Sequence, residues 1–139
     1  MLKYYGRTTE NNLIQCFYSD SWLDITLWLT EADELKAFRM NFTKNRRAYR
    51  FSWSSAGRAE FYYLSKFSPD RRKLPQVFDT DLICTYLSRH GGDLDEEHKG
   101  ILLKVLKKNN GIKLRKTKKK GFFSLFETLM ADVVRILKI

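Results

Sequence analysis

Basic side chains are the residues of this chain whose number and spacing most directly suggest a chemical role. The 139-residue sequence carries a formal net charge of +10, which is unevenly distributed. Residues 36–73 hold 11 basic and 2 acidic side chains, and residues 99–120 hold 10 basic side chains and no acidic one. Residues 1–35 and 74–98 are both net acidic. Separate blocks of this kind indicate surfaces that recognise an anionic partner.

We predict that the basic blocks supply two phosphate-binding clusters and a track between them. The first cluster comes from loops at one end of a sheet: Lys44, Arg46, Arg47, Arg71, Arg72 and Lys73. The second comes from a basic linker: Lys113, Arg115, Lys116, Lys118, Lys119 and Lys120. Arg39 and Arg50 would extend the track across an open sheet face, where Trp28 would stack on a base. Ordinary solvation is the alternative for that face, and the lysine run suits lipid phosphate as well as nucleic acid.

The segment "RHGGDLDEEH" is the one place where both histidines lie near several carboxylates. A metal site would need these side chains to converge, but a glycine turn separates His90 from His98. Asp93 is better explained as the start of a helix, in a capping box with Glu96. A glycine-rich phosphate loop and a nucleophile elbow are both missing from the sequence. We therefore expect a protein that is not an enzyme and that has neither a metal site nor a cofactor.

The two cysteines, Cys16 and Cys84, both lie in apolar runs. Two cysteines are too few for a disulfide framework, so we expect reduced, partly buried thiols and a cytoplasmic protein. A contact between either thiol and a histidine in the folded chain cannot be read from the sequence. The first residues have no apolar signal-peptide core, and residues 122–139 are interrupted by charges.

Alternation of apolar and polar residues dominates the first half of the chain. Residues 23–29 place four aliphatic side chains on one face, with Trp22, Asp24, Thr26 and Trp28 on the other. Similar runs at about 13–18, 35–42, 48–54 and 59–66 are joined by short polar links. This pattern predicts an antiparallel meander of about five strands.

A meander reverses direction at each link, and this predicts which links lie together. Residues 43–47 and 67–75 should lie at the same end of the sheet. The acidic link 30–34 should lie at the opposite end, beside Arg58. The domain should therefore be electrically polar along its strands.

The period of the sequence changes after residue 78, where two segments have the capping residues and apolar stripes of helices. We predict an α+β fold with two to three C-terminal helices packed on one face of the meander. Residues 1–110 would form the domain, with strands at about 13–66 and helices at about 80–108. Residues 111–120 would be a basic linker, followed by an amphipathic helix over 121–139.

The apolar side of this last helix needs a cover. Its docking residues would be Phe122, Phe123, Phe126, Leu129, Met130, Val133 and Leu137. Three destinations are open: the chain's own sheet or a sister subunit in a homo-oligomer, a membrane surface, and a groove on another protein.

The function that these patterns favour is binding of a polyanion. We predict a nucleic-acid-binding accessory subunit, and an acidic protein would exploit the same cations. The alternative is a peripheral membrane or partner-docking adaptor that is anchored by residues 113–139.

Overall fold

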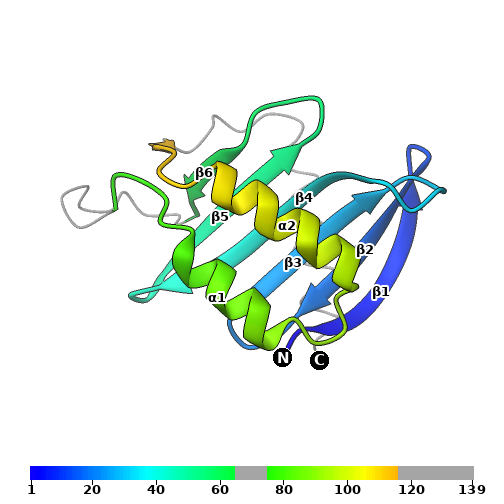
Figure 1. Cartoon of the computed structure of the whole chain (residues 1–139), viewed down its shortest axis with the longest axis horizontal. Helices are drawn as coiled ribbons and strands as arrows, with labels where there is room; N and C mark the ends of the chain where they lie inside the picture. Colours follow the sequence, from blue (N-terminus) through cyan, green and yellow to red (C-terminus); the bar gives the residue numbers. More distant parts are fainter. Residues whose placement is uncertain (65–74, 116–139) are drawn as a thin grey trace.

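Residues 1–64 and 75–115 are described in the computed structural model of the protein, and they form a sheet with helices against one face (Figure 1). The sheet has seven strands in the order of the chain. The strands are β1 (Lys3–Glu10), β2 (Leu13–Ser19), β3 (Leu23–Leu29), β4 (Leu35–Lys44), β5 (Arg47–Ser54), β6 (Glu60–Tyr63) and β7 (Leu114–Arg115). Two helices, α1 (Asp81–His90) and α2 (Glu96–Lys108), lie between β6 and β7 in the chain. The predicted α+β class is confirmed.

The five predicted strands are β2 to β6, and the sheet has one more strand on each side. β1 pairs antiparallel with β2, although its sequence "KYYGRTTE" has no clean alternation. A register shift between Tyr4 and Gly6 interrupts its pairing. β7 pairs parallel with β6 through only two residue pairs. The predicted count of five was therefore too low.

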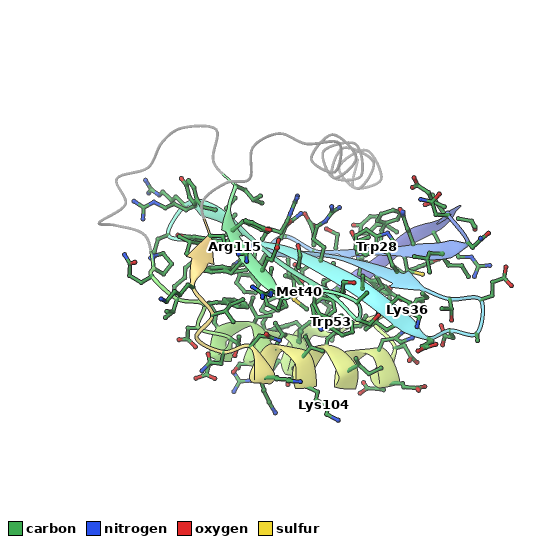
Figure 2. All side chains as sticks on the ribbon, turned by 90° about the horizontal axis from the view of Figure 1, so that it is seen from above. Trp28, Lys36, Met40, Trp53, Lys104 and Arg115 are labelled. Atoms are coloured by element: carbon green, nitrogen blue, oxygen red, sulfur yellow. The ribbon has the colours of Figure 1, made fainter. Side chains whose placement is uncertain are left out.

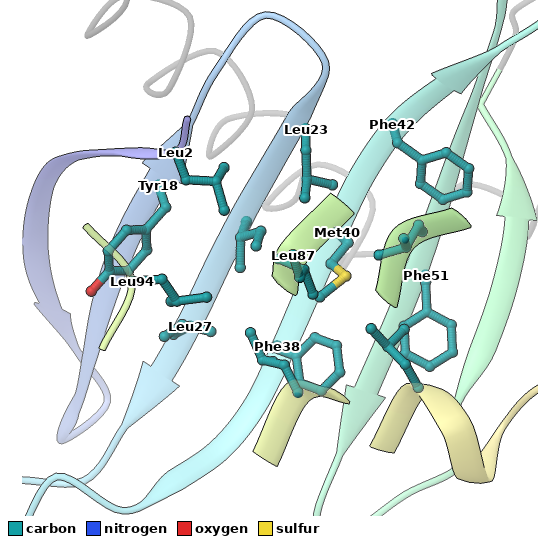
Figure 3. Packing of buried hydrophobic residues seen from close by; sticks show 14 of the residues in the cluster. Leu2, Tyr18, Leu23, Leu27, Phe38, Met40, Phe42, Phe51, Leu87 and Leu94 are labelled. Carbon is teal, nitrogen blue, oxygen red and sulfur yellow. The ribbon is translucent and has the colours of Figure 1, made fainter. Parts of the chain in front are cut away.

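Antiparallel pairing from β1 to β6 builds the meander. The register sets Leu27 of β3 opposite Phe38 of β4, and Met40 opposite Phe51 of β5. These four side chains are at most 1% exposed and face the helices (Figure 3). This face, which we call the helix-covered face, holds the hydrophobic core.

Trp22 does not follow the alternation that was predicted for it. It precedes β3, and its ring packs 4.5 Å from that of Tyr86 in α1 and 5.8 Å from that of Phe42. Hydrogen bonds at Asp20 turn the chain here, because its Oδ1 accepts from the backbone N–H groups of Trp22 and Leu23, both at 2.8 Å. Trp22 therefore belongs to the helix side, and its assignment beside Trp28 was wrong.

The ends of the helices explain their positions. Asp95 is the N-cap of α2 and accepts from the backbone N–H of His98 at 3.3 Å, so the predicted capping box of Asp93 with Glu96 is wrong. Asp93 instead accepts from the backbone N–H of Tyr4 in β1 at 3.0 Å. Lysines in the last turn of α2 suit its dipole. Neither described helix is long and apolar enough to cross a membrane.

The start of the chain is hydrogen-bonded to the link between the two helices. Leu2 donates its backbone N–H to the carbonyl of His90 at 3.0 Å and accepts from the N–H of Asp93 at 2.9 Å. Gly92 has a φ of +53°, and a Cβ there would lie 2.1 Å from the carbonyl oxygen of Leu2. Only glycine allows this approach.

The C-terminal part of the chain is described as far as Arg115. Residues 114–115 of the predicted linker form β7. The remainder of that linker and the whole of the predicted helix 121–139 lie outside the described residues. This includes every predicted docking residue from Phe122 to Leu137.

Candidate polyanion-binding surface

A two-residue turn joins β4 to β5 and carries three basic side chains. Lys44 pairs with Arg47 across the turn, and the residues between them, Asn45 and Arg46, have φ values of 53° and 62°. Two consecutive left-handed residues are the mark of a type I′ hairpin, whose twist suits antiparallel strands. Lys44 and Arg46 are exposed, whereas Arg47 is half-buried beside Tyr49.

Arg46 is held in a conformation that other residues adopt more easily. The left-handed region costs a residue with a Cβ about 1–2 kcal/mol, and glycine is the usual residue at this place in the turn. The other turn of this type, between β1 and β2, uses Asn11 and Asn12 at φ values of 50° and 64°. Asparagine tolerates this region, whereas arginine has no such advantage. An exposed arginine at a strained hairpin tip points to selection for its charge.

The C-terminal end of α2, which lies beside β6, carries further lysines (Figure 1). Lys107 and Lys108 are exposed in its last turn, and Lys113 follows after the helix stops. Asn110 fixes this stop against the start of α1, because its Oδ1 accepts from the backbone N–H of Thr80 at 3.0 Å.

Hydrogen bonds then hold residues 111–114 against residues 76–78. Gly111 donates to the carbonyl of Phe78 at 2.8 Å, and Leu114 donates to that of Gln76 at 3.0 Å. Lys113 and Val77 form an isolated antiparallel β-bridge. Val77 and Lys44 line the same small hollow, so residues 76–78 lie near the β4–β5 hairpin. The register nevertheless sets Lys113 level with Glu60 and Ser52, some distance along the strands from the hairpin tip.

We use the name basic end for the hairpin tip together with the nearby segment from the last turn of α2 to Lys113. Its described cations are Lys44, Arg46, Arg47, Lys107, Lys108 and Lys113. Carboxylates lie close by: Asp79 and Asp81 are exposed at the start of α1, and Asp20 and Asp24 lie in and beside the β2–β3 turn, next to the hairpin.

The opposite end of the sheet is acidic, as predicted. The link between β3 and β4 exposes Glu31, Asp33 and Glu34 there. His98 joins this link to α2, because its Nε2 lies 3.3 Å from the carbonyl oxygen of Asp33. The first turn of α2 adds Glu96 and Glu97. Among the described residues, carboxylates are therefore in excess at this end of the sheet, although Arg58 is also exposed there.

The structure places only some of the predicted residues in this cluster. Lys44, Arg46, Arg47 and Lys113 belong to the basic end. Arg115 is ion-paired with Glu60, with 3.0 Å between Nη1 and Oε1, so its charge is compensated within the chain. Outside the described residues lie Arg71, Arg72, Lys73, Lys116, Lys118, Lys119 and Lys120.

The prediction of a basic track across an open sheet face was wrong. Arg39 is 4% exposed and Arg50 is 8% exposed, so neither guanidinium is presented to solvent. The Nε of Arg50 donates to Oδ1 of Asn41 at 2.8 Å. Trp28 is half-buried, and the Cζ of Arg39 lies 5.5 Å from its ring centroid, a cation–π contact that occupies the ring. These three residues are therefore not part of the basic end.

A second hollow, of about 380 Å³, lies at the acidic side and brings Cys16 and His98 to one lining with Tyr18 and Asp33. The thiol and the imidazole thus line the same hollow. Burial raises the pKa of the Cys16 thiol, so the thiol stays protonated and is a poor nucleophile at neutral pH. Burial also raises the pKa of Tyr18, to about 12. Among residues 1–64 and 75–115, no three potential ligands are grouped to hold a metal ion.

Sequence reasoning missed Lys107 and Lys108 as members of the cluster. They were interpreted only as last-turn residues that complement a helix dipole. The charge block 99–120 contained the signal, but the packing of the end of α2 against residues 76–80 was not readable.

No family model, curated protein or solved structure matches this chain.

Proposed function

We propose that the protein binds a polyanion, nucleic acid before others, through its basic end and without catalysing a reaction. The observation that carries this proposal is that cations from three distant segments lie on the same side of the fold, toward β5 and β6 (Figure 1). They come from the hairpin tip at 44–47, the last turn of α2 and the chain at residue 113. Cations gathered in this way repel one another, and a row of phosphates removes this repulsion.

The strained conformation of Arg46 supports the same role. Selection for stability alone favours glycine or asparagine at a residue with a φ of 62°. Retaining arginine places its charge at the outermost point of the hairpin, where it meets an approaching partner first.

Salt dependence is the first test of this proposal. Each phosphate contact lowers the slope of log K against log salt by about 0.9 on duplex DNA and about 0.7 on single strands. We expect the full chain to bind a labelled 30-nucleotide RNA or DNA in fluorescence anisotropy, and affinity to fall steeply as salt is raised. Binding that ignores salt would refute a phosphate-directed interface.

Two arginine substitutions in turns separate the basic end from net charge. Arg46→Gly removes a cation at the basic end, and Arg58→Gly removes one from the exposed turn between β5 and β6 at the opposite end. We expect Arg46→Gly to weaken binding several-fold. The slope of log K against log salt should become shallower by about 0.7–0.9, which corresponds to one lost phosphate contact. Arg58→Gly should leave both unchanged.

Loss of structure does not explain the expected effect of Arg46→Gly, because glycine relieves the left-handed strain. The melting temperature of this variant should stay equal to or above that of the parent. Equal binding losses in the two variants would show that only total charge matters, and the proposed site would then be wrong.

An anionic-vesicle flotation assay distinguishes the adaptor alternative. Flotation without any nucleic-acid binding would favour a membrane role, and binding of acidic proteins alone would favour a protein partner. Apart from residues 113–115, the segment on which the adaptor hypothesis depends lies outside the described residues. Two free cysteines suit the reducing cytoplasm, which is where we propose that the protein acts.

A further inference from the structure

The sheet face that points away from α1 and α2 also holds buried side chains, although Trp28, Asn41 and Ser52 on it are half-buried. We call it the second face; its central residues are Gln15, Phe17, Thr26, Trp28, Arg39, Asn41, Arg50 and Ser52. Phe17 is 0% exposed and Thr26 is 4% exposed.

The described helices do not cover this face. Figure 2 shows Met40 and Trp53 between the sheet and the helices, with Trp28 on the other side. One bare face of an antiparallel sheet stays in contact with water, and a phenylalanine at its centre would be largely exposed. The described helices therefore do not account for the burial of this face (Figure 2).

We propose that residues 121–139 cover the second face as an amphipathic helix, so that the sheet lies between two helical layers. The chain reaches this face from β7, where Arg115 pairs with Glu60 and stands beside Tyr62. Residues 116–120 can span about 17 Å when extended. A helix over 121–139 is about 28 Å long, and seven strands spaced about 4.8 Å apart measure about 29 Å across. The segment is thus long enough to cross the sheet.

The charge pattern of the segment complements the buried face. With about 100° between successive helical residues, its apolar side chains fill one arc, and Glu127 and Asp132 lie at the two edges of that arc. Buried guanidinium groups are stable only beside carboxylates or other acceptors. Carboxylates flanking an apolar stripe are the arrangement expected opposite Phe17, Arg39 and Arg50.

The other part of the chain outside the described ranges fits less well. Residues 65–74 have the sequence "SKFSPDRRKL", with only two large apolar side chains. They also connect Leu64, which donates to the carbonyl of Ala48 at 3.0 Å, to Pro75, which lines the hollow beside Lys44. Both of these anchor points lie near the β4–β5 hairpin.

A docked segment is not available to a membrane or to a partner's groove. The proposal is therefore independent of polyanion binding, and it decides among the three destinations that the sequence leaves open.

Thiol labelling in the full chain tests this cover directly. Thr26→Cys places a reporter at the centre of the second face, and Thr43→Cys places one at an exposed position near its edge. Peptide mass spectrometry separates these thiols from the native Cys16 and Cys84. We expect position 26 to react roughly 100-fold more slowly than position 43, because the cover must open before it reacts.

Paired substitutions in the segment identify the occupant. Leu129→Asp with Val133→Asp puts two carboxylates on the apolar side, and Ser124→Asp with Ala131→Asp puts two on the polar side. The first pair should expose position 26 to labelling at close to the rate of position 43, with far-ultraviolet circular dichroism confirming that the sheet persists. The second pair should leave protection unchanged.

Three results would overturn the proposal. Fast labelling of position 26 in the parent would mean that the face is open. Continued protection with Leu129→Asp and Val133→Asp would mean that other residues cover it. Protection that disappears on dilution, together with a dimer in analytical ultracentrifugation, would mean that a second copy supplies the segment.

Discussion

The two faces of the sheet both hold buried residues, but they are built from different side chains. On the helix-covered face, Phe38, Met40 and Phe51 are apolar and stack in register across β4 and β5. On the second face, Phe17 lies among buried polar groups such as Gln15 and Thr26. The first face gains stability from packing alone, whereas the second must also satisfy its hydrogen bonds. Burial of a mixed face therefore demands a partner with matching polar groups.

Removing a large ring from the helix-covered face should produce the largest loss of stability. Phe51 is 0% exposed, and its ring lies 5.1 Å from that of Phe78 and 5.7 Å from that of Phe38. We expect Phe51→Ala to lower the free energy of unfolding by about 3–5 kcal/mol, measured by urea denaturation. A loss under about 1 kcal/mol would mean that the ring is not packed as described.

The matching substitution on the second face sharpens the comparison. Phe17→Ala should cost about 3 kcal/mol if this face is a true interior, because a cavity is then left behind. A solvent-exposed ring would instead give a change within about 0.5 kcal/mol. The small value would contradict the burial of the second face.

A smaller loss of stability is expected when a polar contact on the helix-covered face is removed. Tyr86 of α1 donates to Oδ2 of Asp20 at 2.5 Å. Burial acts to raise the pKa of the Asp20 carboxyl, but this hydrogen bond and those from the backbone of Trp22 and Leu23 lower it overall. We expect Asp20→Asn to cost about 1–2 kcal/mol at neutral pH.

The pH dependence of this cost follows from the direction of the pKa shift. A carboxyl with a lowered folded pKa stabilises the protein above its unfolded pKa of about 3.9, and this contribution is lost as pH falls through the folded value. The stability difference between parent and Asp20→Asn should therefore be constant from pH 5 to 7 and shrink below about pH 4. A difference that is equally large at about pH 2 would mean that the charge of Asp20 is not responsible.

The sequence predicted the strands and helices whose apolar residues recur at a regular spacing. Strands β2 to β6 follow from alternation, and both described helices follow from their stripes and capping residues. The acidic end follows as well, because a meander fixes the end at which each link lies. In each case a local pattern is enough, since the signal and the structure span the same few residues.

Long-range packing accounts for what the sequence did not predict. β1 has a bulge at Gly6 that breaks its alternation, and β7 exists only because α2 returns the chain to the edge of β6. Trp22 leaves its expected face because its backbone N–H donates to the side chain of Asp20, and this hydrogen bond turns the chain before β3 begins. The burial of Arg39 was hidden for a similar reason, because polar side chains on alternate positions normally indicate solvent.

The lone parallel strand has a consequence for the order of assembly on the ribosome. β6 is complete at Tyr63, but its outer edge receives β7 only when residues 114–115 have been made. While about fifty further residues are synthesised, β6, with the aromatic sequence "EFYY", is paired with β5 on one side only and its outer edge lacks β7. We therefore expect nascent chains of this protein to be most prone to association late in translation, and this vulnerability should end when β7, which follows both helices in the chain, has been made.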